Sequence, residues 1–224
     1  MMMLMDINKF KHNMIREIFE EPEVIRKTLK HISIDLDKKK DLIPDKFNRT
    51  YITGSGTSYH AGFAGGYALS TISGISSSIL QASEFASWIP QSLMNFLLIA
   101  FSQSGESKDV LAAIKVANER KADIIAVTNT SKSTLARMAK LPLITQAGKE
   151  LSVTATKTYI AQLSAIYQLS INLSETSKYL SIDLLKFKKA LNNAANLVKT
   201  MLETQSRIIQ HIAIKYKKTI SFSF

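Results

Sequence analysis

The sequence contains no cysteine, fewer acidic than basic residues, and no long apolar run. Without cysteine the chain has no disulfide, no thiolate metal site and no cysteine nucleophile, which fits an intracellular protein. No run approaches the roughly 20 apolar residues that a membrane span requires. Residues 1–5 are apolar, but they are far shorter than a signal-peptide core and no basic segment precedes them. These absences predict a soluble, cytoplasmic protein without a membrane partner.

The basic residues outnumber the acidic ones by 29 to 18, which gives a formal net charge of +11. The segment between residues 178 and 218 contains nine basic residues and only two acidic ones. Such a segment can attract nucleic acid or an acidic partner. No aromatic platform is interleaved with the charges, so the pattern favours a solvated helix face over nucleic-acid binding. Hydrophobic content of 46% over 224 residues predicts one sizeable folded core, with about forty to sixty residues of appendage at the ends.

An apolar strand pattern runs through a polar turn into an amphipathic helix near the middle of the chain. Residues 96–101 (FLLIAF) are typical of a strand buried on both faces, and apolar residues recur at helical spacing from Val110 onward. The turn between them, residues 102–107 (SQSGES), supplies hydroxyls, an amide and a glycine beside a helix start, where free N–H groups and the helix dipole favour an anion. Capping of the helix by Ser104 or Ser107 is the alternative.

Strand and helix patterns alternate along the central part of the chain, which predicts a doubly wound α/β fold with a five-stranded parallel sheet and helices on both faces. Pro142 favours a sheet edge for the last strand. Pro22, among three glutamates, is typical of a first helical turn, so the sequence leaves open whether the first helix is broken near this residue. The expected elements are a helix over 7–31, a charged connection over 33–48, and strands at 50–53, 75–80, 96–101, 123–129 and 141–145.

Ligands of such sheets bind at the carboxyl ends of the strands, where the winding direction reverses. With the strand order 2-1-3-4-5, the turns at 54–58 and 102–107 would face each other across one crevice. A third polar segment, residues 152–158, precedes a further apolar helix and could close the crevice, with Lys157 either near an anion or simply at the helix start. Gly56 is followed by Thr57-Ser58 and lacks the lysine of a nucleotide P-loop, and Tyr59 occupies the position of the third glycine in a dinucleotide fingerprint.

The polar turns lie within motifs that resemble a known family in order and spacing. These motifs are GTSYH at 56–60, ASEF at 82–85, SQSGES at 102–107 and VTATK at 153–157. They resemble the sugar isomerase (SIS) domain, and the chain is most similar to the first SIS domain in the isomerase half of the glucosamine-6-phosphate synthases (glutamine–fructose-6-phosphate aminotransferases). The resemblance extends from about Met14 to about Leu169.

The resemblance implies a flavodoxin-like domain that binds a phosphosugar. It implies that the phosphate is held by hydroxyl and amide side chains and that the sugar is contacted from the third polar segment. The implied substrate-binding residues are Thr57, Ser58, Ser102, Gln103, Ser104, Ser107, Val153 and Ala155. Three positions depart from the family pattern: Ser107 stands where threonine is usual, Ala155 where serine is usual, and Ser152 where glycine is common.

Two parts of the related enzymes have no counterpart in this sequence: the glutamine-hydrolysing half with its N-terminal cysteine, and the second SIS domain with the glutamate, lysine and histidine that act on the sugar. Residues 219–224 alternate like the opening strand of that second domain. We therefore expect an N-terminal helical segment (1–45), a SIS domain (46–175), and a basic helical segment (176–224) that ends in this strand-like stretch.

A base within hydrogen-bond reach of the sugar would be needed for isomerisation. The candidates are Glu84, Glu106, Glu150 and His60. Interaction with the positive end of a helix is the alternative role for Glu106, and packing or capping is the alternative role for His60. No spacing rule selects Glu150 as the base.

Three functions remain open. The first is an enzyme of the phosphosugar isomerase or aminotransferase-isomerase type acting on a hexose 6-phosphate such as fructose 6-phosphate or glucosamine 6-phosphate. The second is a non-catalytic phosphosugar sensor or subunit that needs a partner chain. The third is nucleic-acid binding, which is supported only by the positive charge of the C-terminal segment. No cofactor and no metal is expected. Single-domain SIS isomerases place their sites between subunits, so a homodimer or higher homo-oligomer is expected, with a separate chain as a possible source of the second SIS domain.

Overall fold

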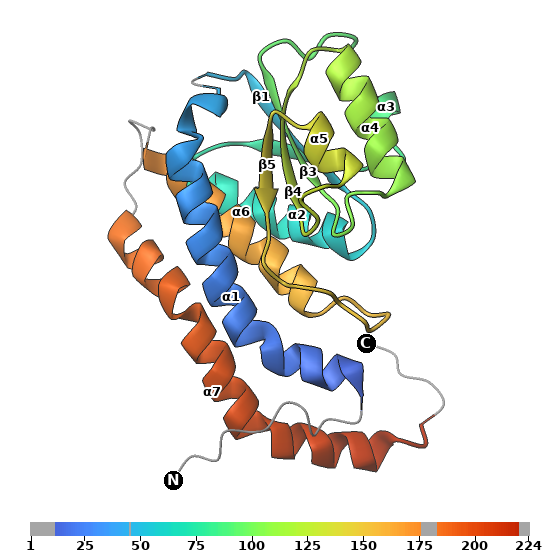
Figure 1. Cartoon of the computed structure of the whole chain (residues 1–224), viewed down its shortest axis with the longest axis vertical. Helices are drawn as coiled ribbons and strands as arrows, with labels where there is room; N and C mark the ends of the chain where they lie inside the picture. The colour runs from blue at the N-terminus through green and yellow to red at the C-terminus, as the bar shows by residue number, and fades with distance from the viewer. Residues whose placement is uncertain (1–11, 45, 176–182, 220–224) are drawn as a thin grey trace.

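The computed structural model describes residues 12–44, 46–175 and 183–219. Five parallel strands form one sheet in the order β2-β1-β3-β4-β5 (Figure 1). This sheet confirms the α/β fold and the strand order expected from the sequence. The strands are β1 (Arg49–Gly54), β2 (Ser77–Gln81), β3 (Phe96–Phe101), β4 (Asp123–Thr128) and β5 (Leu141–Ile144).

Helices cover both faces of the sheet, because the central strands carry apolar side chains on both sides. In β3, Leu97 and Ile99 pack into one core cluster with α1, α2 and α6, whereas Leu98 and Ala100 pack into the opposite cluster with α3 and α4. The unbroken apolar run of this strand follows from that double burial. The helices are α1 (Asn13–Lys38), α2 (Thr57–Ala68), α3 (Phe85–Trp88), α4 (Lys108–Glu119), α5 (Thr134–Met138) and α6 (Lys157–Glu175), with a π-helical turn at Leu69–Ser73 and a 3₁₀ turn at Lys40–Leu42.

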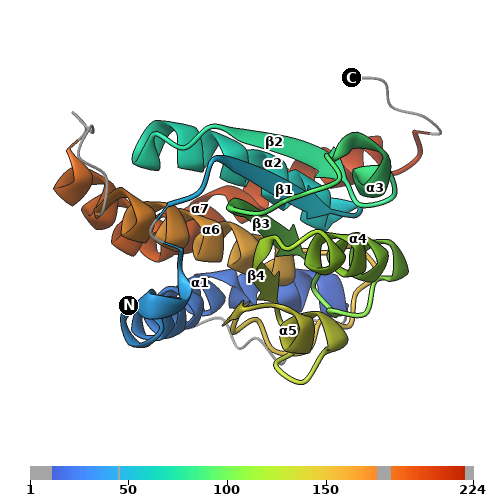
Figure 2. The same ribbon diagram turned by 90° about the horizontal axis from the view of Figure 1, so that it is seen from above.

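A long final helix, α7 (Leu184–Tyr216), lies outside the sheet layers along α1 and α6 (Figures 1 and 2). Ala195 is its single buried residue within the described part of the chain, and it packs with Ile25 and Leu29 of α1. The helices at the two ends of the sheet domain agree with the expected helical extensions. The strand-like stretch expected at 219–224 lies outside the described residues, apart from Thr219.

The first helix differs from the expectation in its extent and in the role of its proline. It continues to Lys38, so the expected charged connection from residue 33 is wrong, because Ile32 and Leu36 extend the buried stripe of the helix. Pro22 is not in a first turn: it lies inside α1, which begins at Asn13 and continues past it. The helix axis changes direction in its N-terminal part (Figure 1), as expected where a proline removes a backbone hydrogen bond.

All five strands lie within one or two residues of their predicted positions. The largest difference is at β2, which begins at Ser77 because Gly74 ends the π-helical turn with a left-handed backbone. β5 occupies one edge of the sheet, as Pro142 indicated. Among the described residues, no helix combines the length and the apolarity needed to cross a bilayer.

Candidate functional site

The first polar turn follows β1 and leads directly into α2. Gly54 ends the strand, and a Cβ there would lie 3.0 Å from both the carbonyl carbon of Ser58 and the backbone nitrogen of Tyr59. A side chain at Gly54 would therefore push the start of α2 away from the sheet. Thr57 is the exposed first residue of α2, and the half-buried Ser58 accepts a hydrogen bond from Gln162 Nε2 of α6 at 3.0 Å.

The second polar turn follows β3 and is held by its own serines. Ser102 Oγ accepts the Gly105 N–H at 3.1 Å, and Ser104 Oγ accepts the Glu106 N–H at 3.2 Å. Ser107 occupies the position before α4, but its side chain makes no capping hydrogen bond. Neither Ser104 nor Ser107, the two proposed caps, therefore caps α4. The hydroxyls of Ser102 and Ser104 are acceptors in these hydrogen bonds, so each can still donate its own proton.

Gly105 permits a close approach between the second turn and the start of α5. Its φ is +68°, and a Cβ there would lie 2.2 Å from Ser133 Oγ. Next to it, Glu106 Oε1 accepts the Thr134 N–H at 2.7 Å, and this hydrogen bond is the main reason why the pKa of Glu106 lies below its usual value. A helix start thus explains Glu106, as expected, but the helix is α5 and not the adjoining α4.

The two turns lie side by side at the carboxyl edge of the sheet. β1 and β3 are hydrogen-bonded neighbours, and Gly54 is in register with Phe101, so residues 55–58 and 102–107 leave the sheet at the same level. The winding direction reverses between these two strands, since β2 lies beyond β1 and β4 beyond β3. The backbone therefore brings together Thr57, Ser58, Ser102, Gln103, Ser104 and Ser107.

The third polar segment precedes α6 and is tied to α1. Glu17 of α1 is fully buried, and its carboxylate accepts the N–H groups of Leu151 (2.5 Å) and Ser152 (3.1 Å) as well as the Ser152 hydroxyl. Burial favours the neutral acid, but these hydrogen bonds outweigh it and lower the pKa of Glu17. In the same segment Val153 is fully exposed and Ala155 is half-buried.

Lys157, whose position the sequence left open, is the first residue of α6 and is 5% exposed. Its Nζ lies 2.6 Å from Glu20 Oε2 of α1. The ammonium group therefore has a carboxylate partner within the chain. This ion pair fixes the start of α6 against α1.

The candidate bases differ in how far their polar groups are already engaged. Glu150 accepts the Thr156 N–H at 2.8 Å and the Thr158 hydroxyl, so its carboxylate caps the start of α6. His60 is exposed on α2, next to the ring of Tyr59. Glu84 immediately precedes α3 and is exposed.

Two residues of this region were not singled out from the sequence. Gln162 is 2% exposed and connects α6 to Ser58; a polar residue inside an apolar helix stripe was the signal. Glu21 has the more unusual environment, because burial and the charge of Glu150 raise its pKa to about 7. Only the fold reveals it, since the two glutamates are far apart in the sequence. Among the described residues, no group of three or more histidine or acidic side chains could hold a metal ion.

Comparison with known proteins agrees with this architecture. The sequence pattern of the SIS domain matches residues 45–172. The chain is 37% identical to the glutamine–fructose-6-phosphate aminotransferase (isomerizing) of Aquifex aeolicus over 93% of its length, and 33% identical to that of Pyrococcus horikoshii over 96%. It covers 34% and 35% of these relatives, about a third of their length. Among solved structures, the C-terminal domain of glucosamine-fructose-6-phosphate aminotransferase from Francisella tularensis is similar, with a TM-score of 0.82 and 26% identity over 91% of this chain and 59% of that one.

Proposed function

Because the chain belongs to the SIS domain family, we propose that it binds a phosphorylated sugar of the hexose 6-phosphate class, such as fructose 6-phosphate or glucosamine 6-phosphate. The observation that carries this proposal is the pairing of two hydroxyl-rich turns after neighbouring strands, with Gly54 and Phe101 in register. Backbone N–H groups and hydroxyls at this edge suit a phosphate.

In the proposed site, the phosphate lies between the first and second turns. The residues assigned to it are Thr57, Ser58, Ser102, Gln103, Ser104 and Ser107. Val153 and Ala155 lie in the third segment, which we assign to the sugar. The anchoring of that segment by Glu17 supports this assignment, because a held loop loses less conformational entropy on binding.

Thermal unfolding with and without ligand tests the proposal. Fructose 6-phosphate or glucosamine 6-phosphate at about 100 times its Kd should stabilise the protein by about 2.7 kcal/mol, or roughly 5–10 °C. Glucose at the same concentration should give a much smaller shift, and a DNA oligomer should give none. Ser104→Ala should abolish most of the shift. Ser87→Ala is the matched control, since Ser87 is exposed on α3 and is not among the residues assigned to the phosphate. Equal shifts with glucose and with the phosphorylated sugars would refute phosphate recognition.

A non-catalytic role, as a phosphosugar sensor or as a subunit that needs a partner chain, is the second candidate. It is favoured by Glu150, whose carboxylate is occupied by the start of α6 and so is not free to abstract a sugar proton. Turnover of fructose 6-phosphate by the purified chain separates the two candidates. Isomerisation or amination by the chain alone would exclude the non-catalytic role.

The domain limits, the cytoplasmic location and self-association stay predictions. We propose the division into residues 1–45, 46–175 and 176–224, and a homodimer or higher homo-oligomer. The contacts of Glu17 and Glu20 with the third polar segment attach the N-terminal helical segment to the sheet domain. Limited proteolysis tests the limits, and light scattering tests the oligomeric state.

A further inference from the structure

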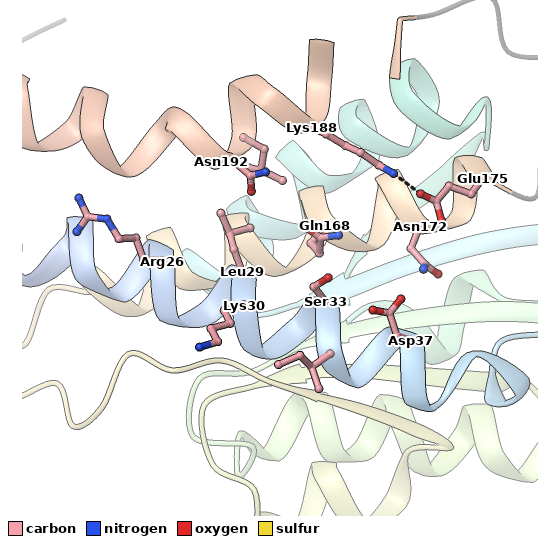
Figure 3. Close-up of a pocket in the computed structure, with 12 residues that line it drawn as sticks. Arg26, Leu29, Lys30, Ser33, Asp37, Gln168, Asn172, Glu175, Lys188 and Asn192 are labelled. Atoms are coloured by element: carbon pink, nitrogen blue, oxygen red, sulfur yellow. Dashed lines mark hydrogen bonds and ion pairs between the residues drawn. The ribbon is translucent and has the colours of Figure 1, made fainter. Parts of the chain in front are cut away.

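A cavity lies among the three long helices α1, α6 and α7, and its volume is about 710 Å³ (Figure 3). Small-molecule sites in proteins typically measure about 300–1,000 Å³. The cavity is thus large enough for an organic ligand. It is lined by Arg26, Leu29, Lys30, Ser33, Ile34, Asp37, Gln168, Asn172, Glu175, Lys188, Leu191 and Asn192.

This cavity is separate from the proposed phosphosugar site. Gln162 near the start of α6 contacts the first polar turn, whereas Gln168 and Asn172 line the cavity further along the same helix. At a rise of about 1.5 Å per residue, these two side chains originate roughly 9 and 15 Å further along the helix axis. None of the residues assigned to the phosphosugar lines the cavity.

Several polar side chains of the cavity have no partner within the described part of the chain. On α1, Ser33 and Asp37 are one helical turn apart and share a face; on α6, Gln168 and Asn172 do the same. Figure 3 shows Asp37 and Asn172 pointing toward one another from the two helices. Asn192 adds an amide from α7. Amides, a hydroxyl and a carboxylate together donate and accept hydrogen bonds, as neighbouring sugar hydroxyls require.

The charges around the cavity nearly balance, because the lining carries three basic and two acidic side chains and Glu23 adds a third carboxylate at the rim. Lys188 forms an ion pair with Glu175. Arg26 is engaged at the rim by Glu23, at 3.4 Å, and by Asn196, at 3.1 Å. The two remaining charges, Lys30 and Asp37, are opposite in sign and lie two turns apart on α1. The cavity therefore favours a neutral ligand over a phosphorylated one, in contrast to the two polar turns.

We propose that this cavity binds a neutral, hydroxyl-rich small molecule, such as an unphosphorylated sugar or polyol. Asp37 accepts hydrogen bonds from ligand hydroxyls, and the amides of Gln168 and Asn172 both donate and accept. Leu29 and Leu191 provide apolar surface for the C–H groups of the ligand. Because the lining comes from three helices, the bound ligand holds α7 against α1 and α6.

Saturation-transfer NMR on the full chain tests the proposal, with glucose and myo-inositol as probes at concentrations up to about 50 mM, which reaches ligands with a Kd in the millimolar range. We expect saturation transfer to at least one probe. Asn172→Leu should weaken that binding by about tenfold or more, since it removes an amide and fills part of the cavity. Asn192→Leu on α7 is a second variant, in case the first does not fold. Gln205→Ala, at an exposed position of α7 outside the cavity, is the matched control.

The same variants separate this proposal from the phosphosugar site. Ser104→Ala should leave glucose or inositol binding unchanged, and Asn172→Leu should leave the thermal shift with fructose 6-phosphate unchanged. The proposal is overturned if neither probe shows saturation transfer, if Ser104→Ala abolishes it, or if a folded Asn172→Leu or Asn192→Leu variant binds as the wild type does. Absent saturation transfer, or wild-type binding by a folded cavity variant, leaves phosphosugar binding at the two turns untouched, whereas loss of binding in Ser104→Ala would assign the probe to those turns.

Discussion

Replacing Gly105 by alanine should destabilise the protein more than the same change at Gly148. The two glycines have nearly equal φ values, +68° and +66°, so both substitutions carry the same left-handed backbone cost of about 1–2 kcal/mol. They differ in the space around them. A Cβ at Gly105 would lie 2.2 Å from Ser133 Oγ and 2.4 Å from Ser133 Cβ, whereas a Cβ at Gly148 would meet nothing within 4 Å.

The extra cost at Gly105 is one of overpacking, which typically amounts to about 1–3 kcal/mol. We therefore expect Gly105→Ala to lower the free energy of unfolding by about 2–5 kcal/mol and Gly148→Ala by about 1–2 kcal/mol. In a chain of this size the difference corresponds to a gap in melting temperature of roughly 2–12 °C. Because the second turn must shift away from Ser133, binding of fructose 6-phosphate should also weaken in the Gly105 variant alone.

Urea unfolding of both variants measures the difference, and thermal shifts with the phosphosugar measure the binding. Ser133→Gly removes the two closest of the three atoms that the new Cβ would meet and leaves Thr128 Oγ1 at 3.0 Å, so in the double variant the two losses should not add in full. Equal destabilisation at Gly105 and Gly148, with phosphosugar binding preserved in both, would refute the account of the turn as closely packed against α5.

Three further predictions concern the acidic residues of α1. The pKa of Glu21 is about 7 in the folded protein, above its value in the unfolded chain, so the free energy of unfolding should fall as the pH rises from about 4.5 to 7. By urea unfolding, Glu21→Gln should raise the free energy of unfolding by about 1–2 kcal/mol at pH 8 and by almost nothing at pH 4. Glu17→Ala should cost about 2–4 kcal/mol because it leaves the partly buried N–H groups of Leu151 and Ser152 unpaired. Glu17→Gln should flatten the loss of stability below about pH 4.5, since the folded pKa of Glu17 is lowered. Lys157→Met should cost about 1–2 kcal/mol, because it removes the shorter ion pair of Glu20 and leaves the longer one with Arg16, at 3.7 Å. The additional change Glu20→Gln should recover part of that loss in a double-mutant cycle.

The sheet was predictable because its signals are local. The apolar run of β3 is short and uninterrupted, and Pro142 removes a ladder hydrogen bond, which only an edge strand tolerates. The two polar turns could be paired in advance because the strand order of a doubly wound sheet determines which strand ends are neighbours. The extent of α1 was missed, since the lysine run after Asp37 and the proline at position 22 both suggested breaks, whereas tertiary packing of Ile32 and Leu36 holds the helix together.

The partners of single polar residues in the candidate site could not be predicted. Glu17 and Ser152 are 135 positions apart, and no local pattern connects them. Lys157 appears in the sequence as a lone lysine, and only the packing of α1 against α6 buries it beside a carboxylate. The unusual pKa of Glu21 has the same origin. Such contacts follow from tertiary structure, and the sequence alone carries no periodicity that reveals them.

The final helix is held against the body of the protein only along its first turns. Beyond Ala195 it exposes a strip of large aliphatic side chains, with Met201, Ile208, Ile209 and Ile212 each more than half exposed. Amide hydrogens in this half should exchange with solvent far faster than those near Ala195, because none of the described residues of α7 beyond Ala195 is buried. This exposed apolar strip also favours association between molecules. Particle sizes measured at high protein concentration will therefore include association through α7, and a dilution series is needed to isolate any assembly built by the sheet domain.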